Sequence, residues 1–399
     1  MIKDIPVENH PVLVARRLAR LAVAALLAVW VGGCTGNSMM RTLTPPPVVQ
    51  NASFAFVSNT NSNAVSAFEL DPKTGLLFPV MGSPFPAGGA PEFMAADAAG
   101  KFLFVANSGS NNISAFQIDG STGALTPAPG SPFSGGTQPE GLALVSSANL
   151  LFVANNGSND ISAFKFDAVT GTLTPVPGSP FPGVPAPMGA ATDITGKFLY
   201  VTNVNGNSVS AFAIDSASGA LTAVAGSPFA TGSTPIGLTA DPNGMFLYVG
   251  DHMSDSDTPA DTVSPFSVDP VNGALRPLGP TPALQPNCSS SCHVNPLRLV
   301  THPTGKFAYG ANVGANTLSA FRLSNGSLTS IASPLATGQH PFGVALDPTG
   351  SFLYVVSKLD NDISGFSVNP ATGMLSPLAG APFGAGGRGP VGIVIVAGH

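Results

Sequence analysis

The chain has 399 residues, of which only 9% are charged, while 46 are glycine and 39 are proline. An apolar content of 44% excludes a disordered chain. The net charge of −6 argues against the basic surface that nucleic-acid binding requires. Many short strands joined by tight turns are therefore expected, and no nucleic-acid partner.

The N-terminal residues have the pattern of a targeting segment. Three arginines between residues 16 and 20 precede the apolar run Leu21–Trp30. This run is too short to span a bilayer, which needs roughly 20 residues. It ends in Val31-Gly32-Gly33-Cys34, which resembles the lipobox of bacterial lipoproteins. We therefore expect a signal peptide over residues 1–33 and a lipid on Cys34; the alternatives are an uncleaved anchor and a plain secretory signal.

The rest of the chain divides into a tether and one large domain. Residues 34–50 contain Pro45-Pro46-Pro47 and are expected to form an extended tether. Residues 51–399 are expected to form the folded domain. With the lipid anchor, this organisation predicts a protein of the bacterial cell envelope, facing the periplasm or held at the outer membrane, and a monomer.

A unit centred on Ser-x-Phe recurs seven times in the folded domain. The copies follow each other at intervals of about 45 to 55 residues, a period typical of β-propellers. They are Ser66–Phe68, Ser114–Phe116, Ser162–Phe164, Ser210–Phe212, Ser264–Phe266, Ser319–Phe321 and Ser364–Phe366. The sequence therefore predicts an all-β fold, a seven-bladed β-propeller.

One repeat shows how a blade of four antiparallel strands is encoded. Strands are predicted at Pro187–Asp193, Phe198–Thr202, Val209–Ile214 and Leu221–Val224, separated by turns rich in Gly, Asn and Asp. The second and third strands are almost entirely apolar, as expected when neighbouring blades cover both sheet faces. The first strand is rich in Gly, Ala and Pro because inner strands crowd around the axis.

The two ends of the domain indicate how the ring closes. The chain enters at Phe54–Val57, which matches a second strand, and the missing first strand is Pro390–Val396 at the other end. The C-terminal strand should therefore complete the first blade, which removes the open sheet edges.

The second strands also carry a family resemblance. Phe198–Asn203 reads Phe-Leu-Tyr-Val-Thr-Asn, and Phe102–Asn107 and Leu151–Asn155 are similar. These segments resemble the Tyr-Val-Thr-Asn repeat, and the whole array resembles the seven-bladed lactonase family, which includes a 6-phosphogluconolactonase and a fungal muconate lactonising enzyme. The resemblance implies hydrolysis or closure of a lactone ring.

The resemblance also indicates where catalytic residues would lie. Pro296 and His302-Pro303 match the family's inner strand and turn, whereas Leu297-Arg298 stands where the family has Arg-His, and Val313 where it has Glu. Arg298 and His302 are therefore the candidate catalytic residues. A buried Arg298 should face the central channel or meet a carboxylate. His302 occupies a turn position that is Asp in other blades, so capping that turn is its alternative role.

Two repeats are longer than the others, and their insertions are expected on one face of the ring, where function is usually found. The first, Asp251–Thr262, carries candidate ligands for a calcium ion, which prefers oxygen atoms. These ligands are Asp251, Asp255, Asp257 and Asp261. The alternative is a solvated acidic loop, so no cofactor is expected unless this loop binds Ca²⁺.

The second insertion, Pro280–Pro296, holds Cys288 and Cys292. In an oxidising compartment a local disulfide between them is expected. Haem attachment through Cys292 and His293 is a weaker alternative because the spacing is one residue too long. A zinc site from both cysteines and His293 would need a fourth ligand, for which His252 is a candidate.

Two groups of polar residues remain. His252, His293 and His340 are candidate ligand-binding residues of this face. A repeated asparagine at strand ends resembles a ring of ligands, but closing Asx-turns is the simpler role. These residues are Asn59, Asn107, Asn155, Asn203 and Asn312.

Three functions remain open from the sequence. The first is a non-catalytic module that binds a small molecule or an envelope protein through the inserted face. The second is a lactonase acting on a small sugar or cyclic-acid lactone. The third is an envelope scaffold without a small-molecule site.

Overall fold

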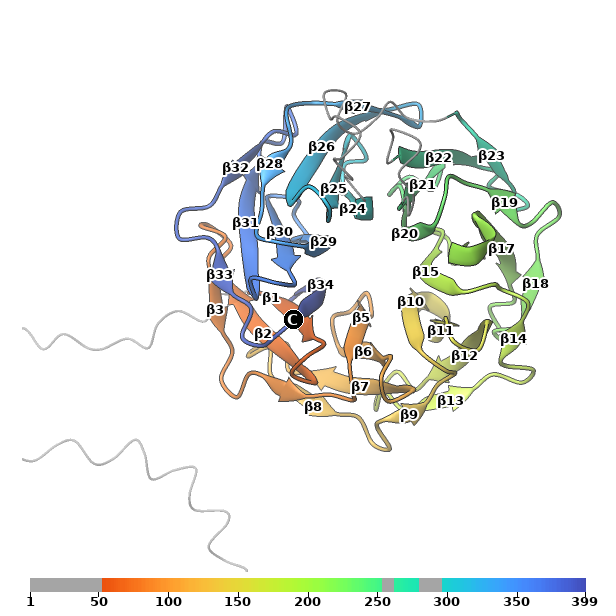
Figure 1. Cartoon of the computed structure of the whole chain (residues 1–399). Helices are drawn as coiled ribbons and strands as arrows, with labels where there is room; N and C mark the ends of the chain where they lie inside the picture. Colours follow the sequence, from red (N-terminus) through yellow and green to blue (C-terminus); the bar gives the residue numbers. More distant parts are fainter. Residues whose placement is uncertain (1–51, 253–261, 280–295) are drawn as a thin grey trace, which may run out of the picture. The chain divides into compact units, whose positions relative to one another are not determined.

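The computed structural model describes residues 52–252, 262–279 and 296–399. These residues form seven antiparallel sheets that radiate from a central axis, which confirms the predicted seven-bladed propeller (Figure 1). The predicted signal peptide and tether lie outside the described residues. Within the described residues the only helices are two short 3-10 turns, η1 (Ser146–Ala148) and η2 (Val204–Gly206). No helix in this part of the chain has the length and apolar character needed to cross a membrane.

Each blade begins with an inner strand beside the axis. In blades one to seven these strands are β34 (Pro390–Ala397), β5 (Pro91–Ala96), β10 (Pro139–Val145), β15 (Pro187–Thr192), β20 (Pro235–Ala240), β24 (Pro296–Thr301) and β29 (Pro341–Leu346). The second strands are β1 (Ser53–Asn59), β6 (Phe102–Asn107), β11 (Leu150–Asn155), β16 (Phe198–Asn203), β21 (Phe246–Asp251), β25 (Phe307–Asn312) and β30 (Phe352–Ser357).

The outer half of each blade completes the sheet. The third strands are β2 (Ala64–Leu70), β7 (Asn112–Ile118), β12 (Asp160–Phe166), β17 (Ser208–Ile214), β22 (Thr262–Val268), β26 (Thr317–Ser324) and β31 (Asp362–Val368). The fourth strands are β3 (Leu77–Pro79), β8 (Leu125–Pro127), β13 (Leu173–Pro175), β18 (Leu221–Ala223), β23 (Leu275–Pro277), β27 (Ser327–Ser330) and β32 (Leu375–Pro377). A two-residue strand, which the sequence did not predict, also pairs with the third strand in six blades: β4 (Phe85–Pro86), β9 (Phe133–Ser134), β14 (Phe181–Pro182), β19 (Phe229–Ala230), β28 (Leu335–Ala336) and β33 (Phe383–Gly384).

The ring closes through its two ends, as the sequence predicted. The C-terminal strand β34 pairs antiparallel with β1, so the order in the first sheet is β3-β2-β1-β34. Val391, Ile393 and Val396 of β34 are buried. The last strand of the chain therefore supplies the inner strand of the first blade.

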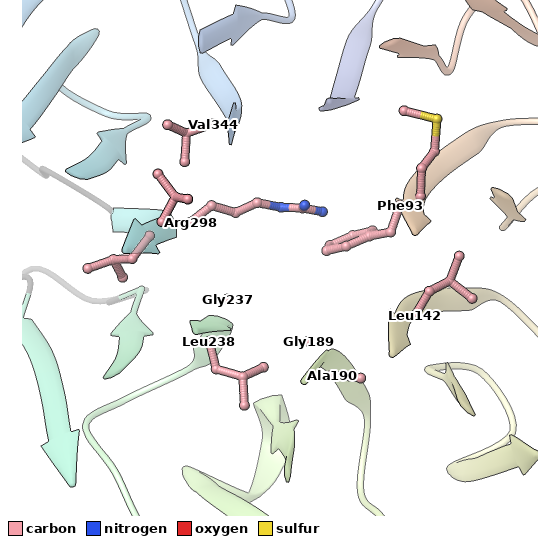
Figure 2. A pocket seen from close by; sticks show the side chains of 11 residues that line it. Phe93, Leu142, Gly189, Ala190, Gly237, Leu238, Arg298 and Val344 are labelled. Carbon is pink, nitrogen blue, oxygen red and sulfur yellow. The ribbon is translucent and has the colours of Figure 1, made fainter. Parts of the chain in front are cut away.

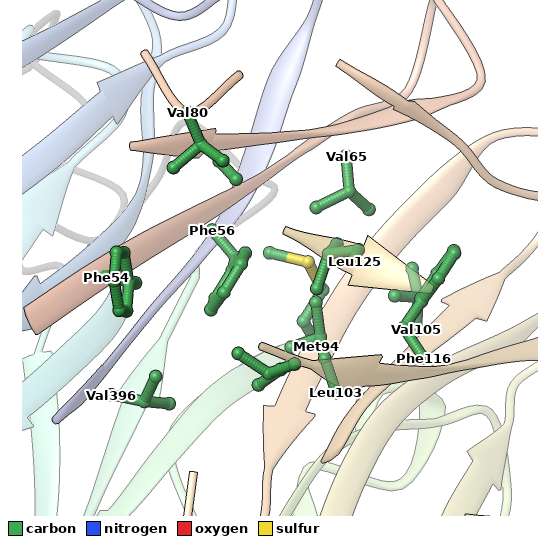
Figure 3. Close-up of a cluster of buried hydrophobic side chains, with 12 residues drawn as sticks. Phe54, Phe56, Val65, Val80, Met94, Leu103, Val105, Phe116, Leu125 and Val396 are labelled. Atoms are coloured by element: carbon green, nitrogen blue, oxygen red, sulfur yellow. The ribbon is translucent and has the colours of Figure 1, made fainter. Parts of the chain in front are cut away.

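The hydrophobic core lies between neighbouring sheets. Between the first two blades, Phe54 and Phe56 of β1 pack with Val105 of β6 and Phe116 of β7 (Figure 3). The second strands are buried from end to end in most blades, for example β6 and β11. Their continuous apolar sequences are explained by this burial on both faces.

The inner strands crowd together at a glycine two residues after their first proline. A Cβ atom added to Gly141 would lie 2.2 Å from the carbonyl oxygen of Met188 in the next blade, and one at Gly189 would lie 2.3 Å from that of Ile236. A Cβ atom added to Gly343 or Gly392 would likewise lie 2.5 Å from a backbone carbonyl oxygen of the next blade, that of Val391 or Glu92. Close approach of the blades therefore explains the small residues that the sequence analysis noted in the inner strands.

A repeated asparagine joins each blade to the next. It lies between the second and third strands with a positive φ, and its Oδ1 accepts the backbone N–H of the residue before the next inner strand. The described members are Asn63, Asn111, Asn159, Asn207, Asn316 and Asn361. Asparagine suits this place because it tolerates the left-handed region and carries its own acceptor.

Candidate functional site

The inner strands of two blades lack the glycine that lies two residues after the first proline. The position two residues after the proline is glycine in five blades, but it is Phe93 in β5 and Arg298 in β24. The two side chains point toward each other across the axis (Figure 2). The guanidinium carbon of Arg298 lies 3.6 Å from the centre of the Phe93 ring, which is a close cation–π contact.

Arg298 brings a charge to an otherwise apolar part of the channel. Its Nε and Nη2 atoms are buried and have no hydrogen-bond partner among the described residues. Burial lowers the pKa of Arg298 to about 10, although Glu92 and Glu140 oppose this shift, so the guanidinium stays charged at neutral pH. The sequence expectation that Arg298 faces the channel is confirmed.

Two carboxyl groups interact electrostatically with this guanidinium. Glu92 of β5 and Glu140 of β10 each follow the first proline of an inner strand. The pKa of Glu140 is raised to about 8, mainly by burial and also by the neighbouring Glu92, while Arg298 and Lys358 act in the opposite direction. Burial also raises the pKa of Glu92. Glu140 Oε2 is buried without a hydrogen-bond partner among the described residues.

A cavity of about 140 Å³ lies beside the Arg298–Phe93 pair (Figure 2). Arg298 is the one charged side chain that lines it, and the others are apolar or glycine. Its walls include Met94, Leu142, Leu238 and Val344. The lining residues come from six inner strands, β5, β10, β15, β20, β24 and β29, so the cavity is part of the central channel. A concave, mainly apolar site with one convergent charged group is the usual form of a small-molecule binding site.

Aromatic and basic residues of the seventh blade interact with the charged groups around Arg298, since Lys358 acts on both Glu92 and Glu140. His340, whose φ is 59°, stacks on Phe342 with a ring-centre distance of 6.1 Å. The Nζ atom of Lys358 lies 5.2 Å from the centre of the same Phe342 ring. Burial, Lys358 and His252 all lower the pKa of His340. His340 therefore sits among the charged groups, and its predicted binding role stays a prediction.

His302 caps the turn that follows β24. Its Nδ1 accepts the backbone N–H of Thr304 at 3.2 Å, so the proton lies on Nε2, which donates to the carbonyl oxygen of Gly350 at 3.1 Å. In the fourth blade Asp193 fills this place and accepts the N–H of Phe198 at 2.7 Å. The predicted alternative role of His302 is thus the one that its contacts support. Both ring nitrogens are engaged in these bonds, so neither is available to a substrate.

The strand-end asparagines bond across strands. The Nδ2 group of Asn155 donates to Ser162 Oγ at 2.8 Å and to Asp160 Oδ1 at 2.7 Å, both on the neighbouring strand β12. The expected structural role is therefore present, but as a link between strands and not as an Asx-turn. It also explains the serine of the repeated Ser-x-Phe unit. The equivalent bonds come from Asn59, Asn107, Asn203 and Asn312.

Two predicted site residues that the structure describes, Asp251 and His252, do not line this cavity. Asp251 takes the strand-end position in the fifth blade, where it is buried and accepts a hydrogen bond from Ser264 Oγ at 2.6 Å. The backbone N–H of His252 donates to Thr234 O at 3.0 Å. Within the described ranges no group of three or more His, Cys, Asp or Glu residues could hold a metal. The remaining predicted residues lie outside the described residues: Cys34, Asp255, Asp257, Asp261, Cys288, Cys292 and His293.

The sequence analysis missed Phe93, Glu92 and Glu140 as site residues. The available signal was the alignment of inner strands, in which only two blades lack glycine after Pro-x and only two carry a carboxyl group after the proline. What the sequence could not supply was that Phe93 and Arg298, from the second and sixth blades, meet across the axis.

Comparison with known proteins assigns the family. A profile described as "Lactonase, 7-bladed beta-propeller" matches four overlapping stretches, residues 47–132, 94–189, 179–290 and 260–387. The chain belongs to the seven-bladed β-propeller lactonase family.

Two curated relatives match short stretches of this chain in sequence. A 6-phosphogluconolactonase of Formosa agariphila is 38% identical over 80 residues, which are 19% of this chain and 23% of the relative. A carboxy-cis,cis-muconate cyclase of Neurospora crassa is 37% identical over 79 residues, 19% of this chain and 22% of the relative. This chain therefore matches only about a quarter of the length of these curated relatives.

The fold extends over much more of the chain than these sequence matches. The solved structure of a periplasmic gluconolactonase from Pseudomonas aeruginosa superposes with a TM-score of 0.73 and 19% identity. The superposition covers 88% of this chain and all of the other. At this identity the likeness concerns the fold alone.

Proposed function

We propose that this protein hydrolyses a small, uncharged lactone in its axial cavity. The observation that carries the proposal is the buried guanidinium of Arg298, which lines the cavity and keeps Nε and Nη2 without a hydrogen-bond partner among the described residues. Buried donors without partners are costly. A lactone carbonyl oxygen that accepts from Arg298 would remove this cost, and the family membership supports the same chemistry.

The proposed reaction uses the charged groups around Arg298. A water molecule attacks the carbonyl carbon, and the guanidinium stabilises the negative charge that develops on the carbonyl oxygen. Glu140 does not line the cavity but interacts with Arg298, and its pKa, raised to about 8, suits it to take the proton from a water molecule between it and the lactone. It then returns the proton to the ring oxygen as the ring C–O bond breaks, and a hydroxy acid is released.

The charge around the cavity favours an uncharged substrate. Arg298 is the only cation among the lining residues, and in this proposal it is already engaged with the carbonyl group. A phosphate group would therefore find no second cation in the lining to pair with, and burying its charge unpaired is costly. The 6-phosphate substrates in the names of some relatives should therefore suit this cavity less well than an unphosphorylated lactone.

The envelope location is part of the same proposal. It is supported by the targeting pattern that ends at Cys34 and by the periplasmic location of the Pseudomonas aeruginosa gluconolactonase, whose fold this chain shares. If Cys34 carries a lipid, Cys34→Ala should move the protein from the membrane fraction to the soluble fraction. Unchanged fractionation would count against the anchor.

The function is tested with a panel of lactones that includes glucono-δ-lactone and its 6-phosphate. We expect kcat/KM well above the spontaneous rate, with the unphosphorylated lactone preferred, and a loss of about 10²-fold or more in Glu140→Gln. Lys165→Gln, an exposed substitution on the outer part of the third blade, is the matched control. A rate no higher than background across the panel would favour the non-catalytic binding module instead.

A further inference from the structure

Phe93 stands at the inner-strand position that is glycine in five other blades. At four of the five glycine positions an added Cβ would strike the neighbouring blade, at Gly141, Gly189, Gly343 and Gly392. Phe93 nevertheless carries a full benzyl group that is only 7% exposed and lines the cavity. The side chain is thus packed into the channel beside Arg298 and occupies space that glycine would leave open.

We propose that Phe93 determines the size of the substrate, so that the cavity takes a compact single-ring lactone and excludes one with a long alkyl tail. The inference rests on the proposed function, because it assumes that the cavity of Arg298 is where the lactone binds. The substrate class is then a compact single-ring lactone, and Phe93 is the residue that limits its size.

The volume of the cavity supports a single ring. An apolar cavity of roughly 150 Å³ in another protein binds benzene, a ring of six atoms. The cavity here measures about 140 Å³, so it is of a size to hold a single lactone ring with small substituents. Leu142, Leu238 and Val344 close other parts of the wall. A long alkyl tail would exceed this volume, and beside Arg298 the Phe93 ring occupies the space into which the tail would extend.

The position of Phe93 makes it the residue that sets this limit. Its ring lies opposite Arg298, 3.6 Å from the guanidinium carbon, so it borders the point where the lactone carbonyl would bind. Its aromatic face also holds the guanidinium in place through the cation–π contact. Phe93 therefore has two separable effects, one on the space beside the carbonyl and one on the orientation of Arg298.

Two substitutions separate these effects. Phe93→Gly installs the residue of the other blades, which removes both the bulk and the aromatic face. Phe93→Leu keeps most of the bulk and loses only the aromatic face. Phe133→Leu, an aromatic residue of the outer strand β9, is the matched control for the loss of a phenyl ring away from the axis.

The test measures kcat/KM for δ-lactones whose alkyl tails lengthen from methyl to pentyl. In the wild type, kcat/KM should fall steeply with tail length, and Phe93→Gly should raise the value for the longest tail by about tenfold relative to the shortest. Phe93→Leu should lower kcat for every lactone and keep the wild-type dependence on tail length, and Phe133→Leu should change neither.

Binding of the corresponding lactams, which resist hydrolysis, separates this inference from the proposed function. The dependence on tail length in the wild type and in Phe93→Gly can be measured by calorimetry even without turnover. If no lactone is hydrolysed but Phe93→Gly gains the long-tailed lactams, the catalytic proposal fails and the size limit stands. If Phe93→Gly has the same dependence on tail length as the wild type in both assays, the size limit is overturned.

Discussion

Glu140 is the ionisable residue whose environment bears most directly on the proposed chemistry. Its carboxyl group is removed from water and lies near a second carboxyl group, and both effects favour the protonated form. Arg298 and Lys358 favour the ionised form, but burial has the larger effect. The result is a carboxyl group that changes its charge near pH 8, where a lactone hydrolase could use it as a base.

This assignment predicts how the rate depends on pH. If ionised Glu140 is the base, kcat/KM should rise as the pH increases through about 8. Glu92→Gln removes a charge that raises the pKa of Glu140, so the midpoint should move to lower pH. Lys358→Met removes a charge that lowers this pKa, so the midpoint should move to higher pH. Initial rates corrected for spontaneous hydrolysis give the midpoints, and the same midpoint in all three proteins would contradict the assignment.

At the scale of elements, the repeated asparagine between the second and third strands explains how blades are linked. Asn159 has a φ of 58°, and its Oδ1 accepts the backbone N–H of Ala186, just before the inner strand of the next blade, at 2.8 Å. The residue thus combines a turn with a hydrogen bond between consecutive blades. The sequence analysis noted turn-forming residues in these loops but did not predict this bond.

Substitution of Asn159 can separate the two contributions. Asn159→Gly keeps the backbone conformation and loses the hydrogen bond, which should lower the free energy of unfolding by about 1 kcal/mol. Asn159→Ala also loses the hydrogen bond but keeps a Cβ in the left-handed region without the polar group that helps Asn tolerate it, so it should be roughly 1 kcal/mol less stable than the glycine variant. Urea-induced unfolding of both variants measures the difference. Equal stability of the glycine and alanine variants would show that the positive φ carries no cost here.

The strands themselves were largely predictable because their apolar runs recur with the blade period. In the fourth blade the four predicted strands agree with β15, β16, β17 and β18 to within about one residue at each end. The two-residue strands were not predicted, since a pair such as Phe229–Ala230 is too short to show a pattern. Hydrogen bonds such as that from Asn155 to Ser162 were also missed, because they depend on the pairing of β11 with β12.

For the whole molecule, the sequence was sufficient to predict the number of blades and the closure of the ring. The phase of the repeat at Phe54–Val57 and at Pro390–Val396 indicated which strand each end must supply, and β1 and β34 do pair. The cavity could not be predicted in the same way. Which side chains meet across the axis depends on ring geometry, and Arg298 and Phe93 belong to blades that do not adjoin.

Closure by β34 predicts a large loss of stability on truncation. Deleting Pro390–His399 removes a strand with three buried apolar side chains and leaves β1 with an open edge. Each such side chain contributes about 1.5–3 kcal/mol, so the loss should be several kcal/mol. Calorimetric melting should show a much lower Tm for this deletion and a far smaller change when only Gly398 and His399 are removed. A full-length Tm in the longer truncation would contradict closure by this strand.

The account as a whole depends on Arg298, and one measurement tests it most directly. The kcat/KM for a δ-lactone should be compared between the wild type, Arg298→Ala and Arg276→Ala, the last being an exposed arginine of the outer strand β23. Loss of the proposed oxyanion donor should lower kcat/KM by about 10²- to 10³-fold in Arg298→Ala, while Arg276→Ala keeps the wild-type value. Turnover in Arg298→Ala equal to that of the wild type would show that the axial cavity is not the site of hydrolysis.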